Sequence, residues 1–119
     1  MLFKYIHHTH HLYNREHTLT PWASVAFNPI DGLLQASPYL INLFLIPIDL
    51  HVHIAMLFIT ALWSTNIHDA LNFNTEPIMG SKYHLTHHLK YNCNYGQYLV
   101  LMDWLFGTLI DPNKEKKEE

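Results

Sequence analysis

The chain has 119 residues, including 11 histidines and one cysteine, with a formal net charge of −3. This length allows one compact domain or part of a larger one, and the absence of a basic excess argues against nucleic acid as a partner. The single Cys93 excludes an internal disulfide and any CxxC-type zinc or redox site. We expect Cys93 to be a small packing residue in a reducing, cytosol-facing environment.

The first predicted element is a helix that ends near Arg15. It carries three candidate metal ligands, His7, His10 and His11. On an α-helix, positions i, i+3 and i+4 share one face, so the three imidazoles would aim at a common point. A loop through Pro21 and Pro29 to Gly32 should follow.

A long apolar block comes next, because no Lys or Arg occurs between Arg15 and Lys82. Residues 32–48 and 50–67 carry no formal charge if their histidines are neutral, and Asp49 alone separates them. Each run lies at the short end of what crosses a bilayer, so we predict an integral-membrane helical hairpin over about 32–67. The alternative is the buried core hairpin of a soluble protein.

Two prolines and the flanking basic residues add detail to this hairpin. Pro38 is expected to interrupt the first apolar helix and Pro47 to close it, and the second helix should run to about Asn66. Four basic residues flank the block, Lys4 and Arg15 before it and Lys82 and Lys90 after it. Both ends should therefore face the cytosol, which places both histidine-bearing helices on the same side.

After a loop at Pro77 and Gly80, a helix near Ser81–Tyr91 is predicted to carry the second histidine triplet. The triplet is His84, His87 and His88, with the spacing of the first. Tyr95 and Gly96 lead into a short amphipathic stretch with Met102, Trp104, Leu105 and Phe106. No strand pattern is found, so the expected fold class is all-α.

The last residues, 111–119, are polar and are expected to be disordered. They end in Lys116-Lys117-Glu118-Glu119, which is either a dilysine retrieval signal of the endoplasmic reticulum or a solvated charge run. At the other end no secretory signal is found, and Met1 lies a few residues before the first triplet. A truncated start is therefore expected.

The two triplets together predict a site for two metal ions, with iron favoured. A zinc hydrolase would typically show HExxH, which is absent. His68, at the end of the second apolar helix, is either a further ligand or a helix-end histidine bonded to the backbone. The remaining histidines lack this spacing and are expected in loops, interfaces or solvent: His8, His17, His51 and His53.

Several stretches beside the histidine triplets carry a resemblance. They are Thr20-Pro21-Trp22-Ala23, Ala26-Phe27-Asn28-Pro29-Ile30-Asp31-Gly32 with Gln35 and Pro38, Ile67-His68-Asp69, and Asn94-Tyr95-Gly96-Gln97-Tyr98. With the triplets they resemble the membrane di-iron sterol C5(6)-desaturases, or lathosterol oxidases, in their plant-type form, within the fatty acid hydroxylase superfamily. The resemblance runs from Lys4 to Gly107 and identifies residues 1–110 as the C-terminal part of that domain.

The resemblance implies removal of two hydrogens from the C5–C6 bond of a Δ7-sterol, with O2 and with electrons passed from NADH through cytochrome b5. It implies a non-haem di-iron centre whose ligands are the histidine boxes and His68, in a multi-pass protein of the endoplasmic reticulum membrane. The expected partners are the sterol, cytochrome b5 or an equivalent donor, and membrane lipid.

Three departures from the family pattern keep alternatives open. The family's upstream HxxxH box is absent, Asn28 stands where family members often have histidine, and Asn72 stands where plant-type members have another. One alternative is another superfamily member, such as a sterol C4-methyl oxidase or a sphingolipid hydroxylase, although the AFxPxDG and NYGQY stretches argue against it. The other is a catalytically inactive membrane fragment that serves as a binding or scaffold element.

Overall fold

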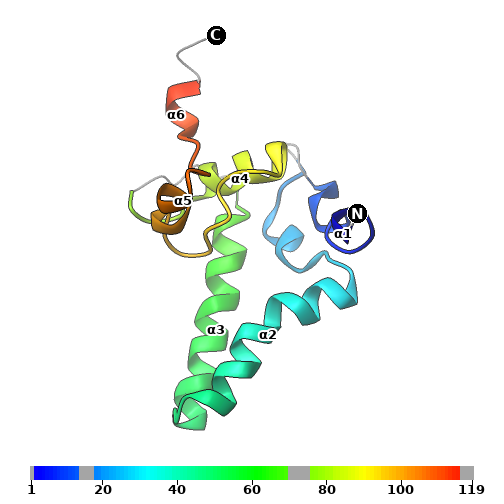
Figure 1. Ribbon diagram of the computed structural model, residues 1–119. Helices are drawn as coiled ribbons and strands as arrows, with labels where there is room; N and C mark the ends of the chain where they lie inside the picture. The colour runs from blue at the N-terminus through cyan, green and yellow to red at the C-terminus, as the bar shows by residue number, and fades with distance from the viewer. Residues whose placement is uncertain (1, 14–17, 70–75, 116–119) are drawn as a thin grey trace.

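The computed structural model describes residues 2–13, 18–69 and 76–115 (Figure 1). Over these ranges the chain is mostly helical and contains no strand, as predicted; an isolated antiparallel bridge joins Ile78 and Leu99. The elements in chain order are α1 (Leu2–Tyr5), the 3₁₀ helices η1 (His10–Leu12) and η2 (Pro21–Val25), α2 (Pro29–Leu45), α3 (Leu50–Ile67), α4 (Ser81–Lys90), α5 (Leu101–Phe106) and α6 (Pro112–Glu115).

The first segment is not the continuous helix that the histidine spacing predicted. α1 ends at Tyr5, residues 6–9 form a turn, and η1 follows, with His10 N donating to His7 O at 3.1 Å. Histidine and threonine are weak helix formers, and an isolated helix of this length is marginal in water. Contacts with the rest of the molecule therefore set the conformation of this segment.

Helix α2 begins earlier than predicted and continues through Pro38. Its start is fixed by Asn28, whose Oδ1 accepts a hydrogen bond from Ile30 N at 2.9 Å, and by Pro29 at the first helical position. Pro38 has no N–H to donate to the carbonyl of Leu34, and the hydroxyl of Ser37 donates to that carbonyl instead, at 2.7 Å. The predicted interruption at Pro38 is therefore wrong.

Helix α3 is capped by Asp49, whose carboxylate accepts from His51 N and Val52 N. It is the one helix in the described residues that is long and apolar enough to cross a membrane, with a mean hydropathy of 1.4 and only 11% of its length buried. Such low burial is unlike the core helix of a soluble protein. A link at residues 46–49 joins α2 to α3, and the two helices diverge from this link, α3 towards α4 and α2 towards the amino-terminal segment (Figure 1).

The part of the chain that follows α4 is fastened by two buried polar side chains. Asp103 accepts from Tyr95 N at 2.7 Å and Gly96 N at 2.8 Å, and from the Thr108 hydroxyl at 2.7 Å. Asn94 donates to the carbonyls of Tyr83 and Ile110, both at 3.1 Å. These bonds fix the loop at residues 94–99 against α4.

The polar tail begins with a helical turn, α6, which differs from the disorder expected from residue 111. Lys82 Nζ of α4 lies 3.5 Å from Asn113 Oδ1, and the Asp111 carboxylate accepts from Asn113 N at 2.9 Å. The dilysine pattern at 116–119, His17 and Asn72 lie outside the described residues.

Candidate metal centre

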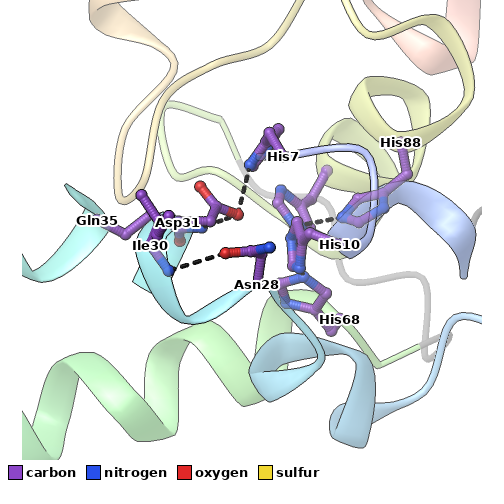
Figure 2. Close-up of polar contacts among 9 residues, drawn as sticks. His7, His10, Asn28, Ile30, Asp31, Gln35, His68 and His88 are labelled. Carbon is purple, nitrogen blue, oxygen red and sulfur yellow. Dashed lines mark hydrogen bonds and ion pairs between the residues drawn. The ribbon is translucent and has the colours of Figure 1, made fainter. Parts of the chain in front are cut away.

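All seven predicted ligands converge between the amino-terminal segment, the end of α3 and α4. They form two groups, His10 with His68, His84 and His88, and His7 with His11 and His87. Within each group the candidate ligand nitrogens lie within 4.8 Å of one another. Most of these rings are buried, and Figure 2 shows His10, His68 and His88 turned towards one another.

In the group of four, consecutive Nε2 atoms are 3.2 Å apart from His10 to His68, 3.0 Å from His68 to His84, and 3.2 Å from His84 to His88. Metal–nitrogen bonds to histidine are about 2.0–2.1 Å long, so two nitrogens at right angles on one ion are about 3 Å apart. The spacing of the Nε2 atoms therefore suits neighbouring positions around a single ion.

Two histidines of the group of three make a hydrogen bond through Nδ1 to an oxygen atom. His7 Nδ1 lies 2.8 Å from the Asp31 carboxylate, and His87 Nδ1 lies 2.7 Å from the carbonyl of Cys93. An oxygen that only accepts requires Nδ1 to carry the hydrogen, so in a neutral ring Nε2 is the nitrogen that would bind a metal ion. His68 of the other group has the same arrangement, with Nδ1 2.7 Å from the carbonyl of Ser64.

Each sequence triplet divides between the two groups, whereas the spacing predicted one common point for each triplet. On α4, residues four apart differ by about 40° around the helix axis, so His84 and His88 reach the same group. His87 is displaced by about 100° from His88 and reaches the other group. Both groups therefore combine histidines from the two ends of the chain.

Hydrogen bonds among the rings cannot account for all three Nε2–Nε2 contacts in the group of four. Because His68 Nδ1 carries the hydrogen, its Nε2 can only accept. His84 Nε2 faces both His68 Nε2 and His88 Nε2, and its single hydrogen can be directed well at only one of them. A cation among the four nitrogens would use every lone pair, so these residues fit a metal ion.

The charge state of the cluster also favours metal binding. Burial, followed by neighbouring imidazoles, lowers the pKa of His10 from 6.5 to about 4 and that of His11 from 6.5 to about 3. The same causes lower the pKa of His84 and His88. Burial also lowers the pKa of His68 and His87, against the effect of their bonds to carbonyl oxygens. These rings are neutral at pH 7, which is the form that binds metals.

The other histidines of the described residues stay outside both groups. His8 is exposed in the turn after α1, and His51 is exposed at the start of α3 beside Asp49. His53 is buried on α3, so of the expected loop, interface and solvent positions a loop and solvent do not apply to it. Asn28 caps α2 through its side chain, which accepts from Ile30 N (Figure 2).

Sequence reasoning missed the groups that orient the ligands. Asp31 accepts from His7 and also from Gln35 Nε2 at 3.0 Å, and it is 5% exposed (Figure 2). An isolated acid at the start of an apolar run was the available signal. The carbonyls of Ser64 and Cys93 leave no such signal, because every residue has one.

A cavity of about 470 Å³ lies beside the histidines. Histidines of both groups line it, together with Gln35 of α2, Ser64 of α3 and residues 94–97 of the loop. This volume lies within the range of small-molecule sites, so the cavity can hold a small ligand beside the histidine cluster.

Comparisons with known proteins match the sequence of this chain to one family. Residues 1–108 match the family model described as fatty acid hydroxylase. The chain is 51% identical over 114 residues to the Delta(7)-sterol-C5(6)-desaturase of Nicotiana tabacum, covering 96% of this chain and 42% of the relative. It is 40% identical over 116 residues to the Delta(7)-sterol 5(6)-desaturase of Leptosphaeria maculans, covering 97% and 32%.

The human relative is a lathosterol oxidase, 36% identical over 118 residues, covering 95% of this chain and 38% of that protein. The chain thus spans about two-fifths or less of the length of these relatives. No solved structure matches the chain significantly.

Proposed function

Because the chain belongs to the fatty acid hydroxylase family, we propose that it supplies the histidine-bearing part of a membrane-bound sterol C5(6)-desaturase. The reaction is removal of two hydrogens from the C5–C6 bond of a Δ7-sterol of the lathosterol or episterol type. Relatives named for this reaction support the proposal. The observation that carries it is the gathering of seven histidines into two groups beside a cavity.

In this proposal each group holds one iron ion, the first through His10, His68, His84 and His88, the second through His7, His11 and His87. When bound, the iron pair supplies, with O2 and electrons from NADH through cytochrome b5, the oxidant that an unactivated C–H bond requires. Asp31 and the carbonyls of Ser64 and Cys93 orient three of the rings. The walls of the cavity position the sterol and exclude water.

The membrane arrangement is part of the same proposal. Helices α2 and α3 form a hairpin in the endoplasmic reticulum membrane, within a multi-pass protein, and both ends of the chain face the cytosol. The exposed apolar surface of α3 and the confinement of basic residues to the two sides of the hairpin support this topology. A sterol can then reach the cavity from the bilayer.

The test is expression of the complete gene product in a yeast strain that lacks its own C5-desaturase, with sterol analysis and iron determination. We expect Δ5,7-sterols and two irons per chain. His88→Gln should abolish the product and lower the iron content, and the exposed His8→Gln is the matched control that should retain both.

Each other result points to a different function. Hydroxylated or demethylated sterol or sphingolipid products, with iron bound, would favour another member of the family. Absence of both iron and product would favour a catalytically inactive fragment with a binding or scaffold role.

A further inference from the structure

Polar side chains interrupt the apolar helices in two successive layers. The layer nearer the histidines contains Gln35 of α2, Ser64 of α3 and Gln97 of the loop, and all three line the cavity. The farther layer contains Tyr39, Thr60 and Tyr98. Tyr39 follows Gln35 by four residues and Thr60 precedes Ser64 by four, so the layers are about 6 Å apart along each helix.

In the farther layer the hydroxyl groups bond to one another. Thr60 Oγ1 donates to the carbonyl of Met56 at 2.9 Å, so it accepts from the hydroxyl of Tyr98, and Tyr39 lies 3.4 Å from that hydroxyl. Trp63 Nε1 donates to the carbonyl of Gln97 at 2.7 Å. This layer fastens the loop to both helices and has a structural role.

In the nearer layer two polar atoms, the Ser64 hydroxyl and Gln35 Oε1, make no hydrogen bond within the described residues. Thr60 and Thr65 of α3 each donate to the carbonyl four residues earlier, at 2.9 and 2.8 Å, whereas the described residues offer no partner to the Ser64 hydroxyl. Gln35 donates through Nε2 to Asp31, and because a carboxylate only accepts, the amide orientation is fixed. Gln35 Oε1 is then an available acceptor at the cavity.

We propose that Gln35 and Ser64 bind the hydroxyl group of the sterol substrate. The Ser64 hydroxyl donates to the substrate oxygen, and Gln35 Oε1 accepts the substrate hydrogen. This inference rests on the proposed function and deepens it, because it assigns the polar end of the substrate within the same cavity.

The chemistry of a Δ7-sterol agrees with this placement. Its single alcohol is on C3, two carbons from C5, so the residues that bind the alcohol must lie close to the oxidising centre. Ser64 is one turn from His68, and Gln35 is one turn from Asp31, which orients His7. The farther layer lies one turn more distant, and its hydroxyls are already paired.

The test compares binding of lathosterol with binding of the corresponding hydrocarbon that lacks the 3-hydroxyl, using the full chain in lipid nanodiscs. We expect the wild type to favour the alcohol by about fivefold or more, the size of one net hydrogen bond. Ser64→Ala and Gln35→Leu should each reduce this preference while leaving hydrocarbon affinity within about twofold of the wild type. Ser64→Thr should retain the preference, because it keeps the hydroxyl.

Thr65→Ala is the matched control, since it removes a hydroxyl from the same helix that already donates to the Ala61 carbonyl. Equal binding of the two ligands to the wild type, or a preference that survives both Ser64→Ala and Gln35→Leu, would overturn this inference and leave the desaturase proposal standing. A chain that binds iron but neither ligand would overturn both.

Discussion

Replacement of Asp31 by Asn tests whether a buried carboxylate tunes the group of three histidines. Asp31 accepts two hydrogen bonds, from His7 Nδ1 at 2.8 Å and from Gln35 Nε2 at 3.0 Å. Both donors reach the same carboxylate oxygen, Oδ2, so the single amide oxygen of Asn can accept both hydrogen bonds, but the negative charge that strengthens His7 as a ligand is lost.

Changes of this kind behind a metal-bound histidine typically cost 10- to 100-fold in affinity, or about 1.4–2.8 kcal/mol. We therefore expect Asp31→Asn to weaken one of two metal sites by this factor and to leave the other within about twofold. Titration with Co²⁺, followed by its d–d absorption, resolves the two binding steps.

Asp49→Asn is the matched control, because it makes the same change at an exposed helix cap, where Asn is as effective as Asp. The reasoning is refuted if Asp31→Asn leaves both affinities at the wild-type value, or if Asp49→Asn weakens binding equally.

Three further predictions concern stability. The pKa of His10 falls from 6.5 in the unfolded chain to about 4 in the fold, so between these pH values the unfolded state binds more protons. The free energy of unfolding of the metal-free chain should therefore be highest above about pH 6.5 and should fall as the pH approaches 4. Denaturant titrations at pH 7 and pH 5 that give equal midpoints would contradict this. Asp103→Ala removes three buried hydrogen bonds and should cost about 3 kcal/mol or more by chemical denaturation, and a loss below 1 kcal/mol would contradict the fastening role of this residue. Gly96→Ala places a methyl group against the Leu99 carbonyl oxygen, whereas Gly107→Ala meets no neighbouring atom and adds only the backbone strain of φ 68°. Gly96→Ala should therefore lower the melting temperature more than Gly107→Ala. The reverse order would contradict the close approach of Gly96 to the Leu99 carbonyl.

The histidines that gather in the cluster were predictable from the sequence, whereas their division into two groups was not. α4 formed as the spacing of its histidines indicated, because Gly80 precedes it and Tyr91, in a left-handed conformation, ends it. The amino-terminal triplet has the same spacing, but local helix propensity there is weak, and contacts of His10 and His11 with His88 and of His7 with Asp31 decide its path.

In the apolar helices, too, some features follow from the local sequence and others from contacts between distant residues. Hydropathy predicted α2 and α3, but not the continuation of α2 through Pro38, where the Ser37 hydroxyl donates to the Leu34 carbonyl that proline leaves without an N–H donor. The presence of Gln35 and Ser64 in the lining of one cavity depends on how two helices diverge from the link at 46–49, which no local pattern encodes.

Because each triplet divides between two groups, a bound ion would cross-link distant parts of the chain and reduce the conformational entropy of the unfolded state. An ion bound by His10 and His68 joins residues that are 58 positions apart, and His88 extends the same closure to α4. In the chain-entropy description, a cross-link over such a loop disfavours the unfolded state by about 4 kcal/mol. The amino-terminal segment, which has little helix of its own, would depend on this closure for its attachment. Iron supply would then determine how long the polypeptide survives proteolysis in the cell, as well as whether it can react.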